Sequence, residues 1–571
     1  MGAHERNATA AVADQPVADA ARPDGQQRWL SRVRLAWAGG YLAAGIVLFL
    51  CYLRVSGTQA VSSDGGSNAL EAWDMLHGNL LLHGWTVTDV SFYTTELPEY
   101  MLLELIRGLS AELVHTAAAL TYTVLVLLAG LVAKGRATGR EGVVRILIGS
   151  GIMLAPQLGT PVFTLLGVPD HVGTGIPLLL ILLVLDRAPR PKAQANAAPR
   201  HWYLPPVIGV MLTWALVADR LVIAALLVPL LLVCCIRVYR SVVLLGKPLR
   251  EQWLEMSLFG AGVVALGVSL LITRLLVRLG GYTVLGLALH LAKVSALPNT
   301  FRLTGQGVLG LYGADFFDMP FGPQLVIALV HLAGVILAGW AVCRALRRFF
   351  GCDDLLVQVL VTGIIVNLAV FAFSNLPYSL WDARNMSPVL AFGAVLAGRL
   401  LAGDLLRLRL LRVSVVPALA VALACYTAAL GFDTAQPQIP AHDQALADWL
   451  VAHNFKYGLS TYFESNITTL DSGGRVHLVG VSWGADKSVP RIYQSEDSWY
   501  DPDLHYANFI VNTGADKPQA LIPPGDWLKA FGPPAKTYHD GPYTILVWNK
   551  NLLAGLGRPG LKGPGNVYPL N

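Results

Sequence analysis

Residues 113–133 read LVHTAAALTYTVLVLLAGLVA, a run without Asp, Glu, Lys or Arg. A helix needs about 20 apolar residues to cross roughly 30 Å of hydrocarbon, so this run predicts a transmembrane helix. Ten further apolar runs predict ten more such helices, near 35–53, 143–158, 171–186, 204–218, 221–236, 254–275, 323–343, 355–373, 388–403 and 413–431. We therefore predict a polytopic α-helical membrane protein with about eleven transmembrane helices.

The composition of the whole chain agrees with this fold class. Hydrophobic residues make up 54% of the 571 residues and charged residues only 14%, whereas a soluble domain is nearer a quarter charged. The net charge of +5 comes from basic residues that flank apolar runs, so we predict no nucleic-acid partner. Arg outnumbers Lys, and Ala and Gly are abundant, which suggests a GC-rich bacterial genome.

The basic residues also set the orientation in the membrane. With the N-terminus inside, the N-terminal arm and the inner loops hold 24 Lys and Arg, the loops being 134–145, 186–202, 237–252, 343–350 and 399–412. The outer loops hold far fewer, among them Arg54, Arg107, Arg220 and Arg384. Since basic residues collect on the cytoplasmic side, we predict a multi-pass plasma-membrane protein with a cytoplasmic N-terminus. An odd number of spans sends the C-terminus to the other side.

The chain divides into three predicted regions. Residues 1–34 lack an apolar run, which predicts a disordered cytoplasmic N-terminus. Residues 35–431 form the transmembrane domain, with large outer loops over 54–112 and 276–322 whose amphipathic stretches 69–76 and 99–106 are expected to lie along the membrane surface. Residues 432–571 combine a helical stretch (441–453) with strand-like runs over 475–483, 508–512 and 543–548. This tail predicts a soluble, mixed α/β domain on the outer side.

The first outer loop is strongly acidic. Between residues 55 and 112 its only basic residue is Arg107, and its carboxylates are Asp64, Glu71, Asp74, Asp89, Glu96, Glu99, Glu104 and Glu112. Asp64 precedes Gly65 and Gly66, which favours a turn from which a carboxylate projects over the membrane surface. The alternative is that Asp64 caps a helix beginning near Ser67.

A second acidic turn follows at Thr94–Tyr100, which reads TTELPEY. Its alternative interpretation is a helix start, with Pro98 in the first turn and Glu99 interacting with the helix dipole. An Asp soon after the first span, a surface helix and then a Tyr/Glu/Pro turn together resemble the GT-C superfamily. These are integral-membrane glycosyltransferases that use lipid-phosphate-linked sugars, including protein O-mannosyltransferases and the aminoarabinose transferase of lipid A.

The resemblance covers most of the chain, through helix number, topology, the large first outer loop and the outer tail. Asp64 matches the acidic residue of the family. Tyr93, Glu96 and Pro98 match its Tyr-Glu-Lys-Pro-like turn loosely, because Leu97 replaces the usual basic residue. The resemblance implies a hexosyl- or pentosyltransferase that moves a sugar from a polyprenyl-phosphate donor to a glycan, lipid or protein acceptor in the cell envelope.

In the implied reaction Asp64 removes the proton of an acceptor hydroxyl while that oxygen attacks the anomeric carbon of the sugar. Tyr93, Glu96 and Glu99 are candidate substrate-binding residues. The phosphate leaving group needs nearby cations or donors, and the candidates are Arg384, which lies just before the tenth span, and Arg220 and Arg302. The alternative for each arginine is a snorkelling or interfacially paired side chain.

Asp170 and His171, at the outer start of the fourth span, form another candidate pair. They could bind a hydroxyl or orient a base, although Asp170 could equally cap the helix. His77, His83, His115 and His290 are isolated, so we predict no zinc site. A divalent cation on Asp64, Glu71 and Asp74 is left open. Because no nucleotide-binding GxxxxGK[ST] motif occurs, an ATP-driven or nucleotide-sugar mechanism is disfavoured.

Two other classes of function compete with a glycosyltransferase. A lipid or sugar transporter, including a flippase, needs charged or broken helices at midplane depth and an internal repeat, and neither is visible in the sequence. A non-catalytic envelope scaffold accounts for the tail but leaves the acidic first outer loop unexplained. The tail is expected to position the acceptor, with aromatic residues that suit sugar stacking or a core: Tyr457, Tyr462, Phe463, Trp483, Trp499 and Tyr500.

Overall fold

The computed structural model describes residues 24–187, 202–285, 289–410, 413–439, 444–483, 488–490, 494–513 and 522–556. The chain divides into two compact units, Met1–Leu48 and Phe49–Asn571. The first unit contributes the N-terminal part of a single helix. The second holds everything discussed below, from the end of that helix to the tail.

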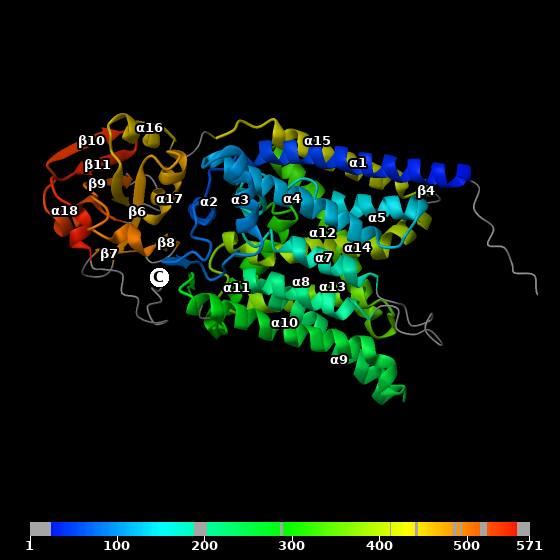
Figure 1. The fold of residues 1–571 in the computed structure, drawn as a ribbon. Helices are drawn as coiled ribbons and strands as arrows, with labels where there is room; N and C mark the ends of the chain where they lie inside the picture. Colours follow the sequence, from blue (N-terminus) through cyan, green and yellow to red (C-terminus); the bar gives the residue numbers. More distant parts are fainter. Residues whose placement is uncertain are drawn as a thin grey trace, which may run out of the picture. The chain divides into compact units, whose positions relative to one another are not determined.

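Every apolar run that predicts a span contains a helix (Figure 1). These helices are α1 (Asp24–Ser56), α4 (Ala111–Lys134), α5 (Gly139–Gly151), α7 (Gly175–Leu185), α8 (Leu204–Ala218), α9 (Val228–Tyr239), α10 (Trp253–Arg278), α12 (Pro323–Arg347), α13 (Leu355–Phe373), α14 (Ser387–Arg407) and α15 (Val416–Thr434). Within the described residues eight are long and apolar enough to cross a membrane, and α7 and α8 are shorter apolar helices. The polytopic helical fold is therefore confirmed.

Two boundaries differ from the prediction. Helix α1 already begins at Asp24, so residues 24–34, which we predicted to be disordered, are helical; residues 1–23 lie outside the described part. A helix propagates easily from an established apolar span into a flanking stretch that lacks Pro. Helix α5 ends at Gly151, well before the predicted residue 158, because Pro156 cannot continue a regular helix.

The two large outer loops are structured and are joined to the tail. The first contains α2 (Ser63–Leu76), β1 (Trp85–Val87) and α3 (Glu96–Arg107), and the second contains β2 (Thr283–Val284) and α11 (Leu297–Leu311). Strand β1 pairs in parallel with β2 and antiparallel with β8 (Ser495–Glu496) of the tail. One small sheet therefore connects both loops with the tail.

Helix α2 is buried within the protein instead of lying on the membrane surface, which corrects the prediction for residues 69–76. It packs against α3 and α4 on one side and against α17 (Tyr462–Asp471) of the tail on the other (Figure 1). A Cβ at Gly65 would lie 2.6 Å from Val114 of α4, and a Cβ at Gly66 would lie 3.3 Å from the backbone of Asn466. The two glycines thus allow this close packing within a helix, where we expected a turn.

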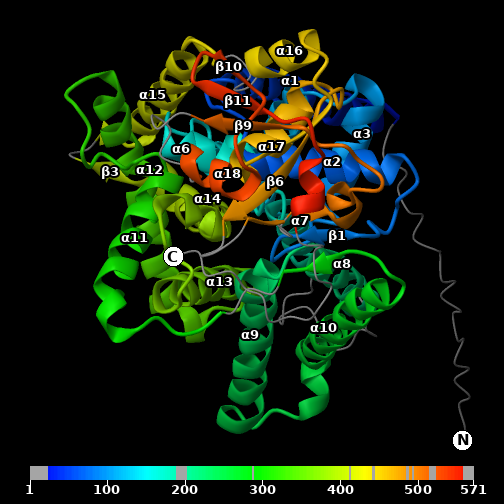
Figure 2. The same cartoon turned by 90° about the vertical axis from the view of Figure 1, so that its left-hand side faces the viewer.

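The tail is a mixed α/β domain, as predicted. Its six-stranded sheet has the order β10-β11-β9-β5-β6-β7, and Figure 2 labels four of these strands (β6, β9, β10 and β11) together with the three helices of the domain. The strands are β5 (Tyr457–Ser460), β6 (His477–Trp483), β7 (Ser488–Pro490), β9 (Phe509–Thr513), β10 (Lys536–Asp540) and β11 (Tyr543–Val547), and the helices are α16 (Gln444–Ala452), α17 and α18 (Pro524–Phe531). Parallel pairing of β5 with β6 places α17 as the crossover helix between them.

The predicted topology can be tested with single cysteines in a background without the six native ones. Thr138, in the predicted inner loop 134–145, and Ala535, in the tail, both lie on the protein surface. We expect an impermeant thiol reagent to label Ala535→Cys from outside and Thr138→Cys only after the inner face is opened. Labelling of both positions from the same side contradicts an odd number of spans.

Candidate active site

Asp64 lies in the first turn of α2 and does not cap the helix. The N-cap is Ser62, whose hydroxyl accepts a hydrogen bond from the Gly65 amide at 3.2 Å, so the capping interpretation of Asp64 is wrong. The carboxylate instead binds two distant side chains. Arg384 Nη1 donates to Asp64 Oδ2 at 2.9 Å, and the Tyr462 hydroxyl donates to Asp64 Oδ1 at 2.6 Å.

Arg384 is presented by the short helix η8 (Leu380–Met386), which precedes α14. Ser379 and Asp382 form a reciprocal capping box at the start of η8, so Asp382 has a structural role there. Helix α11 packs closely on η8, because a Cβ at Gly307 would lie 3.2 Å from Ala383. Arg384 therefore points into the protein, towards Asp64, from a well-packed backbone.

Asp170 lies near the same nitrogen of Arg384, with 4.0 Å between Arg384 Nη1 and Asp170 Oδ2. Asn68 of α2 donates to Asp170 Oδ1 at 2.5 Å. Burial and the nearby Asp64 carboxylate raise the pKa of Asp170 to about 7. The Asp64 and Arg384 side chains keep 20% and 27% of their surface exposed, against 4% for Asp170. A ligand can therefore reach Asp64 and Arg384, whereas Asp170 supports them from behind.

One face of α2 supplies several groups to this cluster. Asp64, Asn68 and Glu71 follow the i, i+4, i+7 spacing that aligns side chains along a helix. Glu71 is buried, its Oε1 has no hydrogen-bond partner among the described residues, and burial and the Asp170 charge raise its pKa well above the ordinary value. Burial thus opposes a charge on Glu71, which lies behind the site.

His171 and Asp219 form a buried pair beside the cluster. His171 Nδ1 lies 2.9 Å from Asp219 Oδ2, which also accepts from the Thr174 hydroxyl at 2.7 Å. Burial disfavours the charged form of His171, but the Asp219 carboxylate has the larger effect, so the pKa of the imidazole is raised. Burial also disfavours the charged form of Asp219, but His171 and the hydrogen bonds to Asp219 have the larger effect, so the pKa of that carboxyl is lowered. His171 has φ +59°, which is unusual for a residue other than glycine. The pair fixes the backbone that carries Asp170.

Glu96 is also close to this region, but it does not contact Asp64. Its carboxyl accepts a hydrogen bond from Thr95 and packs so tightly on Gly173 that a Cβ there would lie 2.5 Å from Glu96 Oε1. Burial, followed by the Asp219 and Asp170 charges, raises its pKa well above the ordinary value. Glu96 therefore packs against the loop that carries Asp170, where burial opposes a charge on its carboxyl.

Four other predicted site residues lie elsewhere. The Tyr93 hydroxyl donates to the Leu80 carbonyl at 2.8 Å. Glu99 accepts from Thr121 of α4 at 2.7 Å, in the α3–α4 interface. Arg220 is exposed, and Arg302 binds Gln306 and Asn299 on its own helix. The structure brings together Asp64, Asp170 and Arg384, with His171 and Glu96 behind them. The four residues described in this paragraph do not lie at Asp64: Tyr93, Glu99, Arg220 and Arg302.

The three carboxylates considered for a divalent cation do not converge. Asp74 Oδ2 accepts from Trp85 Nε1 and from Asn79 Nδ2, both at 2.7 Å, away from Asp64. Across the described residues no group of three or more His, Cys, Asp or Glu side chains is placed to hold a metal ion. A cation at the acidic first outer loop stays a prediction, and no chemical step below depends on one.

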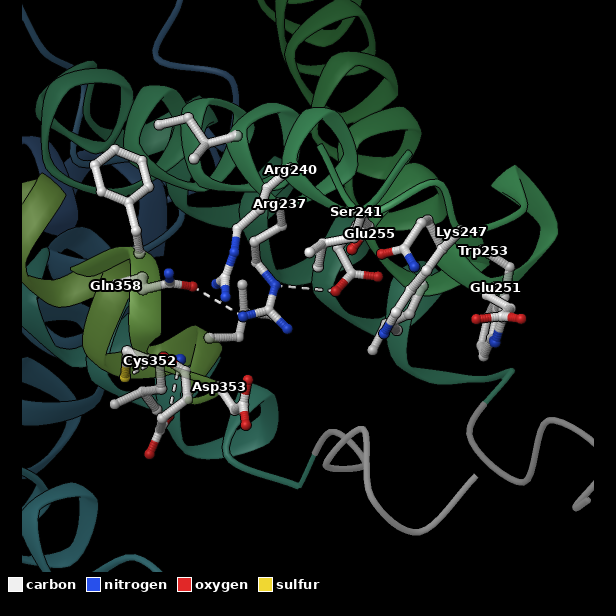
Figure 3. A pocket seen from close by; sticks show the side chains of 18 of the residues that line it. Arg237, Arg240, Ser241, Lys247, Glu251, Trp253, Glu255, Cys352, Asp353 and Gln358 are labelled. Atoms are coloured by element: carbon white, nitrogen blue, oxygen red, sulfur yellow. Dashed lines mark hydrogen bonds and ion pairs between the residues drawn. The ribbon is translucent and has the colours of Figure 1, made fainter. Parts of the chain in front are cut away.

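A cavity of about 150 Å³ lies in a different place, among the ends of α9, α10 and α13 that the predicted topology puts on the inner side (Figure 3). Its basic residues Arg237, Arg240 and Lys247 are outnumbered by five acids, Asp186, Glu251, Glu255, Asp353 and Asp354. Arg237 already binds Glu255 at 3.0 Å and Gln358 at 2.9 Å. This cavity does not suit a phosphate ester.

The sequence did not single out several residues that the structure places at the site. Asn68 and Asp219 bind Asp170 and His171, and Asp89 interacts electrostatically with His171 and Arg384. The i+4 spacing from Asp64 was the only sequence signal for Asn68. Tyr462 was expected to stack on a sugar or to lie in a core, but it binds Asp64. Of the other tail aromatics, Tyr500 is buried, Tyr457 and Trp499 pack against the core, and the Trp483 side chain lies outside the described residues.

Replacing Asp170 by Asn is expected to stabilise the protein at high pH. The folded-state pKa of Asp170, about 7, lies above its ordinary 3.8, so the cost of burying the charge is full above pH 7 and vanishes below about pH 4. Asp170→Asn should therefore raise the melting temperature by a few degrees at pH 8, with the difference shrinking towards pH 5. Thermal unfolding in detergent at both pH values measures this, and equal melting temperatures at pH 8 contradict it.

Similarity to known proteins was found only at the level of structure. Neither a protein-family model nor a curated protein sequence matches the chain. The crystal structure of ArnT from Cupriavidus metallidurans bound to undecaprenyl phosphate is similar over 92% of this chain and 99% of that chain, with 14% identity and a TM-score of 0.53. The apo state of ArnT is similar over 92% of this chain and 100% of that chain, with 15% identity and a TM-score of 0.51.

A weaker similarity covers 83% of this chain and 69% of the apo oligosaccharyltransferase of Archaeoglobus fulgidus, with 12% identity and a TM-score of 0.47. No inference about this chain is drawn from that similarity. The two ArnT structures show that the chain shares the overall fold of ArnT, in agreement with the resemblance found in the sequence.

Proposed function

We propose that this chain is a GT-C-type glycosyltransferase that transfers a sugar from a polyprenyl-phosphate donor to a cell-envelope acceptor on the outer side of the plasma membrane. The observation that carries the proposal is the contact between Asp64 and Arg384, at 2.9 Å and partly exposed. A base for the acceptor and a cation for a phosphate lie side by side, in a chain with the GT-C fold. ArnT was crystallised with undecaprenyl phosphate, which supports a donor of this chemical class.

The reaction is a displacement at the anomeric carbon. The oxygen of an acceptor hydroxyl forms a bond to that carbon, and its proton passes to Asp64. The bond from the carbon to the phosphate oxygen breaks, and its electron pair stays on the polyprenyl phosphate. Arg384 stabilises the charge that develops on this leaving group, because a guanidinium has five N–H donors that match phosphate geometry.

The Asp64–Arg384 contact must open when the donor binds. In a direct displacement the base and the leaving group act on opposite faces of the sugar, and in inverting glycosidases the two carboxyl groups are roughly 6.5–9.5 Å apart for this reason. The sugar therefore enters between Asp64 and Arg384. The donor phosphate then replaces Asp64 as the anionic partner of Arg384, and Asp64 becomes available as the base.

Comparison of a strain that lacks this chain with the same strain carrying it tests the proposal, by mass spectrometry of lipids and envelope glycans. We expect one saccharide to be missing without the chain and its polyprenyl-phosphate donor to accumulate on the outer leaflet. Accumulation on the inner leaflet instead identifies a flippase. An unchanged set of lipids and glycans contradicts both a glycosyltransferase and a flippase and favours a non-catalytic scaffold.

A further inference from the structure

Tyr462 connects the soluble tail to the proposed base. It lies on α17, 398 positions after Asp64 in the chain, and its hydroxyl donates to Asp64 Oδ1 at 2.6 Å. Arg384 binds the other carboxylate oxygen. Only 4% of Tyr462 is exposed, so its ring is held by protein and not by solvent. Two rigid donors from different parts of the chain thus hold the two oxygens of one carboxylate.

The Tyr462 hydroxyl also contacts the side-chain oxygen of Gln494, but a phenol has one proton and cannot donate to both groups. A charged carboxylate is the stronger acceptor, so the proton belongs to Asp64. The Gln494 nitrogen is buried and has no partner among the described residues. Rotation of this amide exchanges its oxygen and nitrogen. The Gln494 N–H then donates to Tyr462, which donates to Asp64, and each bond strengthens the next.

The docking of α17 on α2 keeps this chain of hydrogen bonds in place. Asn466 Nδ2 donates to the Ser67 hydroxyl at 2.5 Å and to the Gln494 backbone carbonyl at 3.2 Å. The Ser63 hydroxyl donates to the Phe463 carbonyl at 3.0 Å. Ser63 and Ser67 flank Asp64 on α2, so the tail forms hydrogen bonds with the same helix turn that carries the proposed base.

We propose that Tyr462 is a positioning residue for sugar transfer, and that the soluble tail thereby completes the active site. This rests on the proposed function. Tyr462 holds one oxygen of Asp64 so that the carboxylate keeps its orientation when the donor draws Arg384 away. A carboxylate has about four lone-pair positions, so the bond to Tyr462 still allows it to accept the acceptor's proton. The tail then contributes to the chemical step, in addition to its expected role of positioning the acceptor.

Tyr462→Phe tests the proposal in the full-length protein in nanodiscs. The assay is release of polyprenyl phosphate from polyprenyl-phosphoryl mannose, glucose or arabinose, whichever the wild type uses. We expect kcat to fall about tenfold, because a misplaced catalytic group costs up to about 10² in rate, with KM for the donor unchanged. The matched control is Tyr500→Phe, which removes a buried 2.7 Å hydrogen bond to Gly480 inside the tail and should keep wild-type kcat.

A double-mutant cycle separates positioning of Asp64 from general damage. In an Asp64→Asn background there is no base to position, so adding Tyr462→Phe should change kcat less than twofold. If Tyr462→Phe lowers the melting temperature, Gln494→Leu keeps the phenol and removes only its donor, with an expected loss of about threefold. Additive losses in the cycle, or wild-type kcat for Tyr462→Phe, overturn the positioning role. Full activity of Asp64→Asn overturns the proposed function itself.

Discussion

Asp64→Asn is expected to lower turnover by about 10² to 10⁴, the usual share of general acid–base catalysis. Asn has nearly the same size as Asp, but its amide has a single acceptor oxygen, so it can accept a hydrogen bond from only one of Arg384 and Tyr462, and it cannot take the acceptor's proton. The helix cap is unaffected because Ser62 provides it. The lost ion pair is partly exposed, so we expect at most about 1 kcal/mol less stability.

The control for negative charge in the same loop is Glu112→Gln. Glu112 is exposed and pairs only with the exposed Arg107, so its removal should leave turnover within about twofold of wild type. Glu71→Gln is unsuitable because Glu71 lies behind the site. A wild-type rate for Asp64→Asn, with the same melting temperature, removes Asp64 from the chemistry.

Arg384→Ala is expected to lower kcat by about 10² to 10³, as the loss of one preorganised donor to a developing charge does in other enzymes. Polyprenyl phosphate, the product, should also inhibit the variant more weakly than the wild type. Arg384→Lys should recover part of the activity, because an ammonium keeps the charge but lacks the bidentate fork.

Arg302→Ala is the matched control for Arg384→Ala. Arg302 also lies in a predicted outer loop, but among the described residues its side chain binds Gln306 and Asn299 of its own helix. We expect turnover within about twofold of wild type. Since Arg384 is the cation near both Asp64 and Asp170, the melting temperature of Arg384→Ala has to be measured on the same sample. Equal activity of the two alanine variants, at matched expression, contradicts a phosphate-binding role of Arg384.

The transmembrane helices could be predicted because long apolar runs have one stable form in a bilayer. The helices of the soluble tail were harder to predict from the sequence. Helix α17 reads YFESNITTLD, with polar and β-branched residues that favour helix weakly, and it forms because it packs on α2 and β6. Gly65 and Gly66 indicated a turn, but here their small size serves helix packing. Local sequence signals cannot distinguish these two uses of glycine.

The members of the site could be proposed one by one, but their arrangement could not. Asp64 and Arg384 were both candidates, and nothing in the sequence shows that side chains 320 positions apart form an ion pair. Tyr462 was considered only for sugar stacking or a core, because no motif around it points to Asp64. Conversely, Tyr93 and Glu99 belong to a suggestive acidic turn, and yet their side chains bind Leu80 and Thr121. The loose match of that turn to the GT-C pattern, with Leu97 for a basic residue, is consistent with this.

The central claim is that the chain itself breaks the bond between a sugar and polyprenyl phosphate. The most direct test is the purified full-length protein in nanodiscs, supplied with polyprenyl-phosphoryl mannose, glucose and arabinose and with envelope lipids and glycans as acceptors. We predict that one donor releases polyprenyl phosphate at a rate proportional to the amount of protein, and that its sugar appears on an acceptor. Intact donors, at a protein concentration that exceeds theirs, contradict the account.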